Sequence, residues 1–348
     1  MPFIRLDEYA SDLDYRHLPD KIILDSDYQD VSREFLSYCS LYVGVINGYS
    51  PSEAGARFYE SIVDIAFDFS GQHIRISRDY VNAETSVKTC ISFHIGMIAA
   101  ELLANLYYSA GPLLHLNDRM LNVVNIRKKP DFFGVGPQGT AYLFEAKGTA
   151  DDFVSNNTIR DAKLQLNAVR SVSFNGTQNP RVYNAANIRK IITAISFYHG
   201  DALISHIDPD EVSPDSYDLV IDADKAMADH YWHVVKLINN SKCKDSIRVG
   251  DRVYIGTYML DKFIGIDADV YAALGEYSLI FQYDTFEGMN ITGIYDRVNK
   301  VLESINAYTD YISKDNNNSF GGFGQDYYLS RDGVIVKSMN NNDAQYGA

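Results

Sequence analysis

Residues 130–147, which read PDFFGVGPQGTAYLFEAK, constrain the fold of this chain more than any other stretch. Two short apolar runs flank a turn rich in glycine and proline, and the second run ends in Glu145-Ala146-Lys147. Because side chains alternate along a strand, Leu143, Glu145 and Lys147 share one face, and the residues between them lie on the other. Both faces begin apolar, so the stretch predicts a hairpin whose second strand is covered on both sides.

Three charged groups are expected to meet at one end of this hairpin. Asp131 opens the first strand, and Glu145 and Lys147 close the second. Two carboxylates and an ammonium at the edge of a covered sheet are costly unless a ligand or a partner charge compensates them. A divalent cation is the simplest compensation.

The pattern Pro130-Asp131, a gap of thirteen residues and then Glu145-Ala146-Lys147 resembles the motif of the PD-(D/E)XK nuclease superfamily, which has the restriction-endonuclease-like fold. The resemblance covers about residues 86 to 200. It implies that Mg²⁺, with Mn²⁺ as a substitute, binds the carboxylates of Asp131 and Glu145 and the backbone carbonyl of Ala146. It further implies that Lys147 orients or deprotonates a water, or neutralises the scissile phosphate. The alternative is an ordinary strand pair with a surface Glu/Lys pair.

The longest apolar segment, residues 89–111, predicts a helix that ends at Gly111-Pro112. Its length would allow a membrane span, but Glu101 near its middle favours a buried helix and no membrane. His94, Glu101, Asn105 and Tyr108 recur at helical spacing and form one polar stripe, which must face water, a partner or an active site. The resemblance makes Glu101 a further catalytic and metal-binding candidate. The alternative is a charge-paired core residue.

The order of elements also resembles the superfamily core, which runs helix, three strands, helix, strand. After the helix, residues 119–127 and the two runs of the hairpin read as strands. Asn156 or Asn157 then caps a helix over 158–172, and 189–197 reads as a buried strand. We therefore expect an α/β fold with a mixed sheet and a restriction-endonuclease-like core. The expected parts are an acidic N-terminal extension (1–85) with a helix beginning at Ser50, the core (86–200), an α+β region (201–313), and a flexible loop, hairpin and disordered tail (314–348). Residues 215–240 are expected to be helical, and the hairpin is expected to turn at Asp332-Gly333.

The charge of the chain is distributed unevenly. The formal net charge is −15, but residues 119–200 hold eleven Lys/Arg against five Asp/Glu, a balance of +6. A contact with a phosphate backbone needs such a local patch rather than a basic whole. The candidate nucleic-acid contacts in this window are Arg127, Lys128, Lys129 and Arg160. The resemblance adds Lys163 and Gln165, because the superfamily often carries a polar residue that reaches the site on this helix. The alternative is a solvated surface that happens to be basic.

Other signals are weaker. His230 and His233 could bind a metal from one helix face, but no third ligand stands at a recognised spacing, so we interpret them as a polar helix face. The three cysteines, Cys39, Cys90 and Cys243, lie far apart and indicate a reducing compartment. The N-terminus lacks a signal-peptide pattern, and we expect a cytoplasmic protein.

The sequence therefore favours Mg²⁺-dependent hydrolysis of a nucleic-acid phosphodiester, with DNA preferred over RNA because the resemblance implies it. Such nucleases serve restriction, antiviral defence or repair, and often act as homodimers. The alternatives are a non-catalytic nucleic-acid-binding or assembly module on the same fold, an RNA-directed nuclease, and an unrelated α/β protein with a chance motif. A further hypothesis is that the acidic flanks cover the basic region until a regulatory protein partner or the substrate displaces them.

Overall fold

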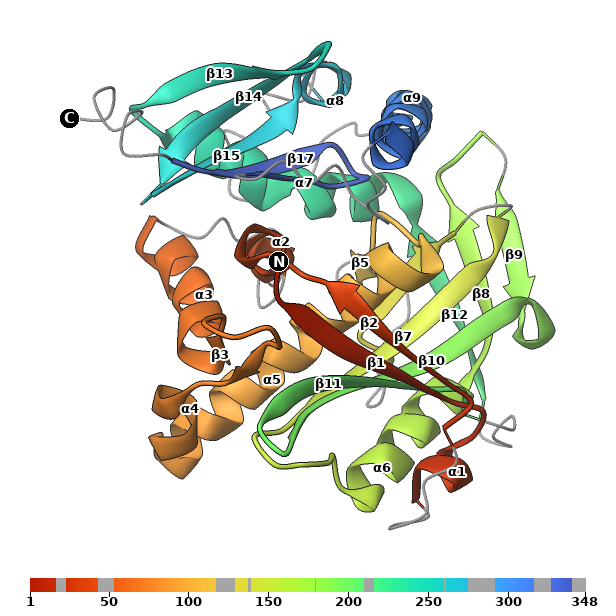
Figure 1. Cartoon of the computed structure of the whole chain (residues 1–348). Coiled ribbons are helices and arrows are strands. Elements are labelled where there is room, and N and C mark those ends of the chain that lie inside the picture. Colours follow the sequence, from red (N-terminus) through yellow and green to blue (C-terminus); the bar gives the residue numbers. More distant parts are fainter. Residues whose placement is uncertain are drawn as a thin grey trace.

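The computed structural model describes residues 1–16, 23–42, 53–116, 129–136, 139–178, 180–209, 216–259, 261–274, 292–315 and 327–339 (Figure 1). Arg127, Lys128 and the strand expected over 119–127 lie outside the described residues, as do Ser50 and most of the expected loop and tail after 314.

A mixed sheet forms the body of the protein, so the expectation of an α/β fold with a mixed sheet is confirmed. Its strands, in spatial order, are β2 (Asp25–Asp30), β1 (Phe3–Tyr9), β11 (Asp201–Ile207), β10 (Ile188–Tyr198), β7 (Ala141–Gly148), β6 (Phe132–Val135) and β5 (Leu114–His115), with β3 (Phe67–Asp68) and β4 (Arg75–Ile76) beside β11. The pairs β1–β11 and β10–β7 are parallel, and the other neighbours are antiparallel. Strands from both expected flanking regions therefore belong to the same sheet as the hairpin.

The two faces of this sheet pack against different helices. Phe144 of β7 and Ile191 of β10 lie in one core cluster with α5 (Thr85–Leu103) and its π-helical last turn, η1 (Ala104–Tyr108). Leu143 and Ile192, one residue away on each strand, lie in a second cluster with α6 (Asn156–Asn167). This is the two-sided burial predicted from the alternation along 141–147.

Two glycines set the distance between α5 and β7. A Cβ on Gly96 of α5 would lie 2.9 Å from the carbonyl carbon of Lys147, and a Cβ on Gly148 would collide with the backbone oxygen of Ser92. Gly148 is the last residue of β7, and its missing side chain permits the close approach.

The cap expected at Asn156 or Asn157 is instead Ser155, whose hydroxyl accepts a hydrogen bond from the backbone N–H of Thr158 (3.2 Å). Helix α6 therefore starts at Asn156, before the expected 158, and it ends earlier than expected, at Asn167. Residues expected in its last turns form β8 (Val169–Asn175), which pairs with β12 (Tyr217–Asp222) and β9 (Arg181–Asn184) in a separate three-stranded sheet. Buried Val172 and Phe174 alternate with partly exposed Ser171 and Ser173, and this period of two replaces the helical one.

A third sheet, antiparallel throughout, lies above the main sheet in Figure 1. Its strands are, in order, β13 (Lys244–Val249), β14 (Arg252–Met259), β15 (Lys262–Asp267), β17 (Val334–Ser338) and β16 (Tyr327–Leu329). The helices near it are α7 (Ala223–Asn240), α8 (Ala268–Ala273) and α9 (Ile294–Asp315). The hairpin expected at Asp332-Gly333 is confirmed, with Gly333 at φ +80°. The helix expected over 215–240 starts only at Ala223, because its first residues form β12.

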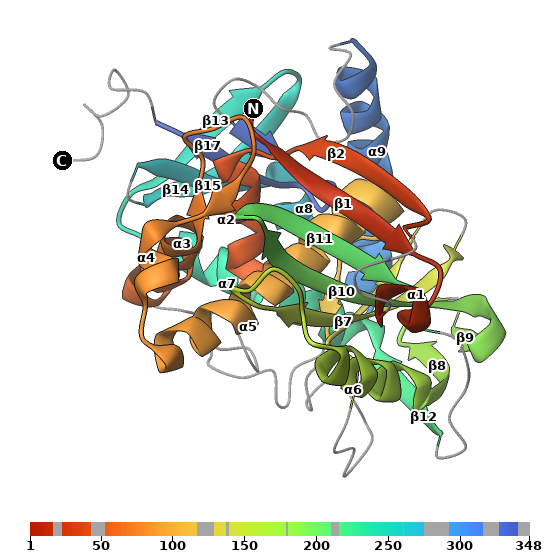
Figure 2. The same ribbon diagram turned by 60° about the horizontal axis from the view of Figure 1, so that its bottom comes forward.

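The N-terminal region packs against the main sheet and the five-stranded sheet. It contains α1 (Asp12–Arg16), α2 (Arg33–Tyr42), α3 (Glu53–Ala66) and α4 (Arg78–Asn82). Helix α2 contacts α3, α5 and β17, so it joins the two sheets. In Figure 2, α6 and α1 lie at the opposite end of the molecule from β13 and β17.

Candidate functional site

Asp131 and Glu145 lie next to each other at the edge of the main sheet. Phe132 pairs with Phe144 in the β6–β7 ladder, so the next residues outward are Asp131 and Glu145. The Asp131 N–H donates to the Phe144 carbonyl (3.0 Å), and the Ala146 N–H donates to Asp131 Oδ2 (2.8 Å). Just before β6 begins, the Asp131 carboxylate thus accepts the hydrogen bond that a backbone carbonyl would accept in a longer strand.

Lys147 completes the group. Its ammonium forms an ion pair with Glu145 Oε1, and the Lys147 side chain is 22% exposed while that of Glu145 is 1% exposed. Both residues lie on the α6 face of the sheet, the face of Leu143. The structure therefore brings Asp131, Glu145 and Lys147 together, and the partly exposed Lys147 side chain connects the group to solvent.

Burial dominates the electrostatics of the two carboxyl groups. Burial, and then the charge of Asp131, raises the pKa of Glu145 to about 8, against the opposing effect of Lys147. Burial also raises the pKa of Asp131, while Lys147 and the Ala146 N–H act in the other direction. A second cation at this edge would favour the ionised form of both groups.

The oxygen atoms at this edge fit a hard divalent cation. Within the described part of the chain, no donor reaches Glu145 Oε2, which is buried. The N–H and C=O of a strand residue point to the same side, so the Ala146 carbonyl projects past the end of β6, beside Asp131. Two carboxylates and one carbonyl suit Mg²⁺, which keeps several waters of its own. Over the described residues, no group of three or more His, Cys, Asp or Glu side chains is placed to hold a metal ion.

Glu101 does not join this group. It projects from α5, which covers the other face of the sheet, and its Oε1 accepts a hydrogen bond from the Asn105 side chain (2.9 Å). Its charged neighbour is Asp332, which accepts hydrogen bonds from Tyr38 (2.9 Å) and His230 (2.8 Å). These five residues, from α2, α5, α7 and the β16–β17 hairpin, form what we call the Asp332 cluster. The helical phase of α5 places Glu101 about 140° from Gly96, which faces β7.

The polar stripe predicted on α5 meets protein groups along its whole length. His94 stacks on Tyr59 with ring centroids 5.6 Å apart, and the Tyr108 hydroxyl lies 2.9 Å from His206 Nδ1. His230 and His233 of α7, expected on a polar helix face, are buried at 6% exposure each. Tyr42 stacks on His230 at 4.4 Å, so the apparent polarity of this helix is internal.

The residues expected to contact nucleic acid differ in whether their side chains are already bound to other protein groups. Gln165 donates to the Lys129 carbonyl (3.1 Å), two residues before Asp131, and so anchors the segment that leads into the site. Lys163 forms an ion pair with Asp12 of α1 (2.7 Å), which occupies its ammonium. Arg160 is exposed on α6.

Two residues near the site carried no recognisable sequence signal. Tyr217 is the first residue of β12. Burial raises the pKa of the Tyr217 phenol, and the nearby charge of Glu145 raises it further. Lys190 shares the α6 face of β10 and donates to the Val169 carbonyl (3.0 Å). The sequence separation between 145 and 217 explains the omission, since no local period links them.

The segment Thr85–Tyr108 is long and apolar enough to cross a membrane, and 61% of its most apolar window is buried inside the protein. That burial is typical of a core helix of a soluble protein. Comparisons with protein-family models, curated proteins and solved structures found no match for this chain. Inference about function therefore depends on the geometry of the site.

Proposed function

We propose that this protein is a Mg²⁺-dependent phosphodiester hydrolase that acts on nucleic acid, DNA in preference to RNA, on a restriction-endonuclease-like core. The observation that supports it is the meeting of Asp131, Glu145 and Lys147 at one partly open sheet edge, with a buried carboxylate oxygen still available. Charges of this kind are expensive to gather unless chemistry requires them.

The order of elements also supports the proposal. Helix α5 is followed by β5, β6, β7, α6 and β10, an order similar to the expected helix, three strands, helix, strand. Strand β5 precedes the strand expected over 119–127, which lies outside the described residues, and β8 and β9 stand between α6 and β10. Parallel pairing of β7 with β10 places Ile192 beside Glu145 and Ala194 beside Lys147. The buried strand β10 therefore supports the strand that carries both charged residues.

Each residue has a role that its position permits. Asp131, oriented by the Ala146 N–H, and Glu145 would hold Mg²⁺ with the Ala146 carbonyl. When bound, Mg²⁺ supplies a water of lowered pKa and offsets negative charge on the phosphoryl oxygens. If Glu145 Oε1 binds the metal ion, the Lys147 ammonium is released from the ion pair and can turn toward solvent. There it would orient a water or contact the phosphate. Gln165 keeps the Lys129–Asp131 segment in place.

The test is cleavage of plasmid DNA, linear DNA and RNA in Mg²⁺, Mn²⁺ or EDTA by wild-type protein and by Lys147→Ala. We expect metal-dependent cleavage of DNA that Lys147→Ala abolishes. Equal cleavage by both proteins would point to a contaminant and refute the assignment.

The chain offers a matched control. Glu60 of α3 and Lys262 of β15 form another ion pair, with side chains 5% and 1% exposed. Lys262→Ala removes the same kind of charge from the same kind of pair, away from β6 and β7. It should lower stability and leave the cleavage rate per folded molecule unchanged.

The ion pair itself favours a second candidate, a non-catalytic nucleic-acid-binding or assembly module on the same fold. In that case the Lys147 ammonium compensates Glu145 permanently and no metal enters. Binding of DNA without cleavage in Mg²⁺ and Mn²⁺, unaffected by EDTA, would select this candidate.

A further inference from the structure

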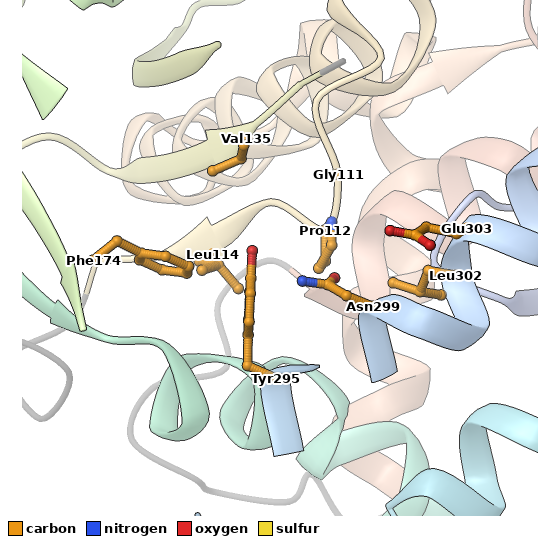
Figure 3. Close-up of a pocket in the computed structure, with 9 residues that line it drawn as sticks. All are labelled: Gly111, Pro112, Leu114, Val135, Phe174, Tyr295, Asn299, Leu302 and Glu303. Carbon is orange, nitrogen blue, oxygen red and sulfur yellow. The ribbon is translucent and has the colours of Figure 1, made fainter. Parts of the chain in front are cut away.

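A pocket of about 190 Å³ opens where the edge of the main sheet meets β8 and α9 (Figure 3). Leu114 comes from β5, Val135 from β6 and Phe174 from β8, and α9 supplies the opposite wall. The pocket is therefore built from separate segments between residues 111 and 303 that meet only in the folded chain.

Most of the wall is apolar and flat. The rings of Phe174 and Tyr295 meet edge to face, with centroids 4.9 Å apart and planes at 77°. Leu114, Phe174 and Leu302 are buried at 3%, 2% and 4% exposure, so they form rigid sides. Asn299, one turn after Tyr295 on α9, lines the pocket beside that ring. Such a wall fits a planar ring system.

The polar groups lie on one side. Asn299 and Glu303 are one turn apart on α9, and in Figure 3 both side chains project beside Pro112. A carboxylate only accepts hydrogen bonds, and an amide donates and accepts. No lysine or arginine lines the pocket among the described residues, so a phosphate or carboxylate ligand would face Glu303 without a compensating cation. The walls select a neutral planar ligand with N–H donors on one edge.

We propose that this pocket binds a nucleobase, with guanine as the preferred base. Guanine presents N1–H and the N2 amine side by side, which match the two oxygens of Glu303, and its O6 can accept from Asn299. Enzymes that act on nucleic acid commonly hold an extruded base between aromatic or apolar side chains in this manner.

The position relative to the candidate site gives the pocket a role in substrate selection, a role that rests on the proposed function. Asp131 directly precedes β6 and Val135 is its last residue, so four residue steps place them on the same face, about 13 Å apart along the strand. That length corresponds to roughly four nucleotides of a duplex strand. A base held here would belong to the substrate strand a few nucleotides from the phosphate at Asp131 and Glu145.

The experiment is titration of the full-length protein with guanosine, inosine, adenosine, cytidine, uridine and inorganic phosphate, in EDTA, followed by calorimetry or ligand-observed NMR. A ligand of this size is expected to bind with a dissociation constant on the order of a millimolar. Inosine, which lacks the N2 amine, and uridine should bind roughly ten-fold more weakly than guanosine, and phosphate should not compete.

Two variants locate the binding. Glu303→Ala, at an exposed helix position, should weaken guanosine binding roughly ten-fold. Val135→Phe, which fills the pocket, should abolish it. Glu84→Ala, an exposed glutamate outside the pocket, is the control for loss of one negative charge. Melting temperatures near that of wild type verify folding.

Guanosine binding that is insensitive to both pocket variants, competition by phosphate, or no saturable binding of any nucleoside at about ten times the expected constant overturns the inference. Because the nucleoside titration is done in EDTA, it tests the pocket independently of the metal-dependent cleavage. Guanosine binding without any cleavage activity leaves the pocket assigned and refutes the nuclease, and cleavage without guanosine binding does the reverse.

Discussion

Two glutamates of this protein, Glu145 in the candidate site and Glu101 in the Asp332 cluster, have the same titration behaviour and different surroundings. Burial raises the pKa of each to about 8, and each has an Oε2 atom that is buried with no hydrogen-bond partner in the described part of the chain. A shifted pKa alone therefore does not distinguish a reactive carboxyl group from a structural one.

The difference lies in access and in the neighbouring charges. Glu145 stands between Asp131 and a lysine that is 22% exposed, at the end of the β6–β7 ladder. Glu101 is enclosed by three helices and a hairpin, and its neighbour Asp332 is already satisfied by His230, Ser330 and Tyr38. Burial alone would raise the pKa of Asp332, but these donors, His230 first, bring it below its ordinary value.

The largest expected effect is on cleavage. Glu145→Gln and Asp131→Asn each remove a charged oxygen from the candidate metal site, and each should lower the cleavage rate by roughly 10³-fold. Glu101→Gln should leave the rate of the folded protein within about two-fold of wild type, because it lies on the other side of the sheet. A matching loss in Glu101→Gln would show that both glutamates serve one reaction and would end the comparison.

The next effect is on stability, and it should appear in the closed cluster. Asp332→Ala removes the buried acceptor that Tyr38 and His230 share, which is expected to cost about 3–5 kcal/mol of unfolding free energy in urea. Asp269→Ala, at a side chain 77% exposed, should change it by less than about 0.5 kcal/mol. A loss of under 1 kcal/mol for Asp332→Ala would mean that the hairpin is not held by this carboxylate.

The extent to which the sequence predicts these two regions depends on how local each is. Alternation over residues 141–147 is a property of one strand, so the shared face of Glu145 and Lys147 could be read directly, and Asp131 needed only one hairpin turn. The polar stripe of α5 was also visible, but its partner Asp332 lies more than two hundred residues later. The resemblance to a nuclease motif suggested Glu101 as a ligand of the same metal, but α5 covers the face of the sheet opposite to that of Glu145.

Strands without a clear alternation of apolar and polar residues were not predicted, for a related reason. Strand β2, DSDYQD, is an exposed edge strand whose first four residues face solvent, and nothing in its polarity marks it as part of a sheet. Strand β1 was hidden in the same acidic region, although Ile4 and Leu6 are buried. Only the pairing with β11, from residues after 200, makes it a central strand.

Metal binding provides a third, smaller effect that separates the two glutamates. A ligand that binds only the folded state at one hundred times its dissociation constant adds about 2.7 kcal/mol to the unfolding free energy. We expect Mg²⁺ to stabilise wild type and Glu101→Gln by amounts of this order, and EDTA to reverse it. Glu145→Gln should gain little. Equal gains in both variants would place the cation elsewhere.

The smallest effect is the pH dependence of stability, which both glutamates share. Each carboxyl group has an ordinary pKa of 4.5 and a folded pKa of about 8, so the folded protein holds protons that the unfolded chain has released. The stability from these protonated groups is fully present below pH 4.5 and is lost as pH rises through about 8. Each group contributes at most about 1.4 kcal/mol per pH unit within that window.

Urea unfolding between pH 5 and 9 would test this and separate the two groups. Glutamine mimics the protonated acid, so Glu101→Gln and Glu145→Gln should each flatten the fall in stability by about 1 kcal/mol per pH unit in EDTA. In Mg²⁺, which favours the ionised carboxylate, the slope due to Glu145 should disappear, while the slope due to Glu101 should remain. A slope that Mg²⁺ leaves unchanged would mean that the open edge, like the closed cluster, keeps its proton and binds no cation.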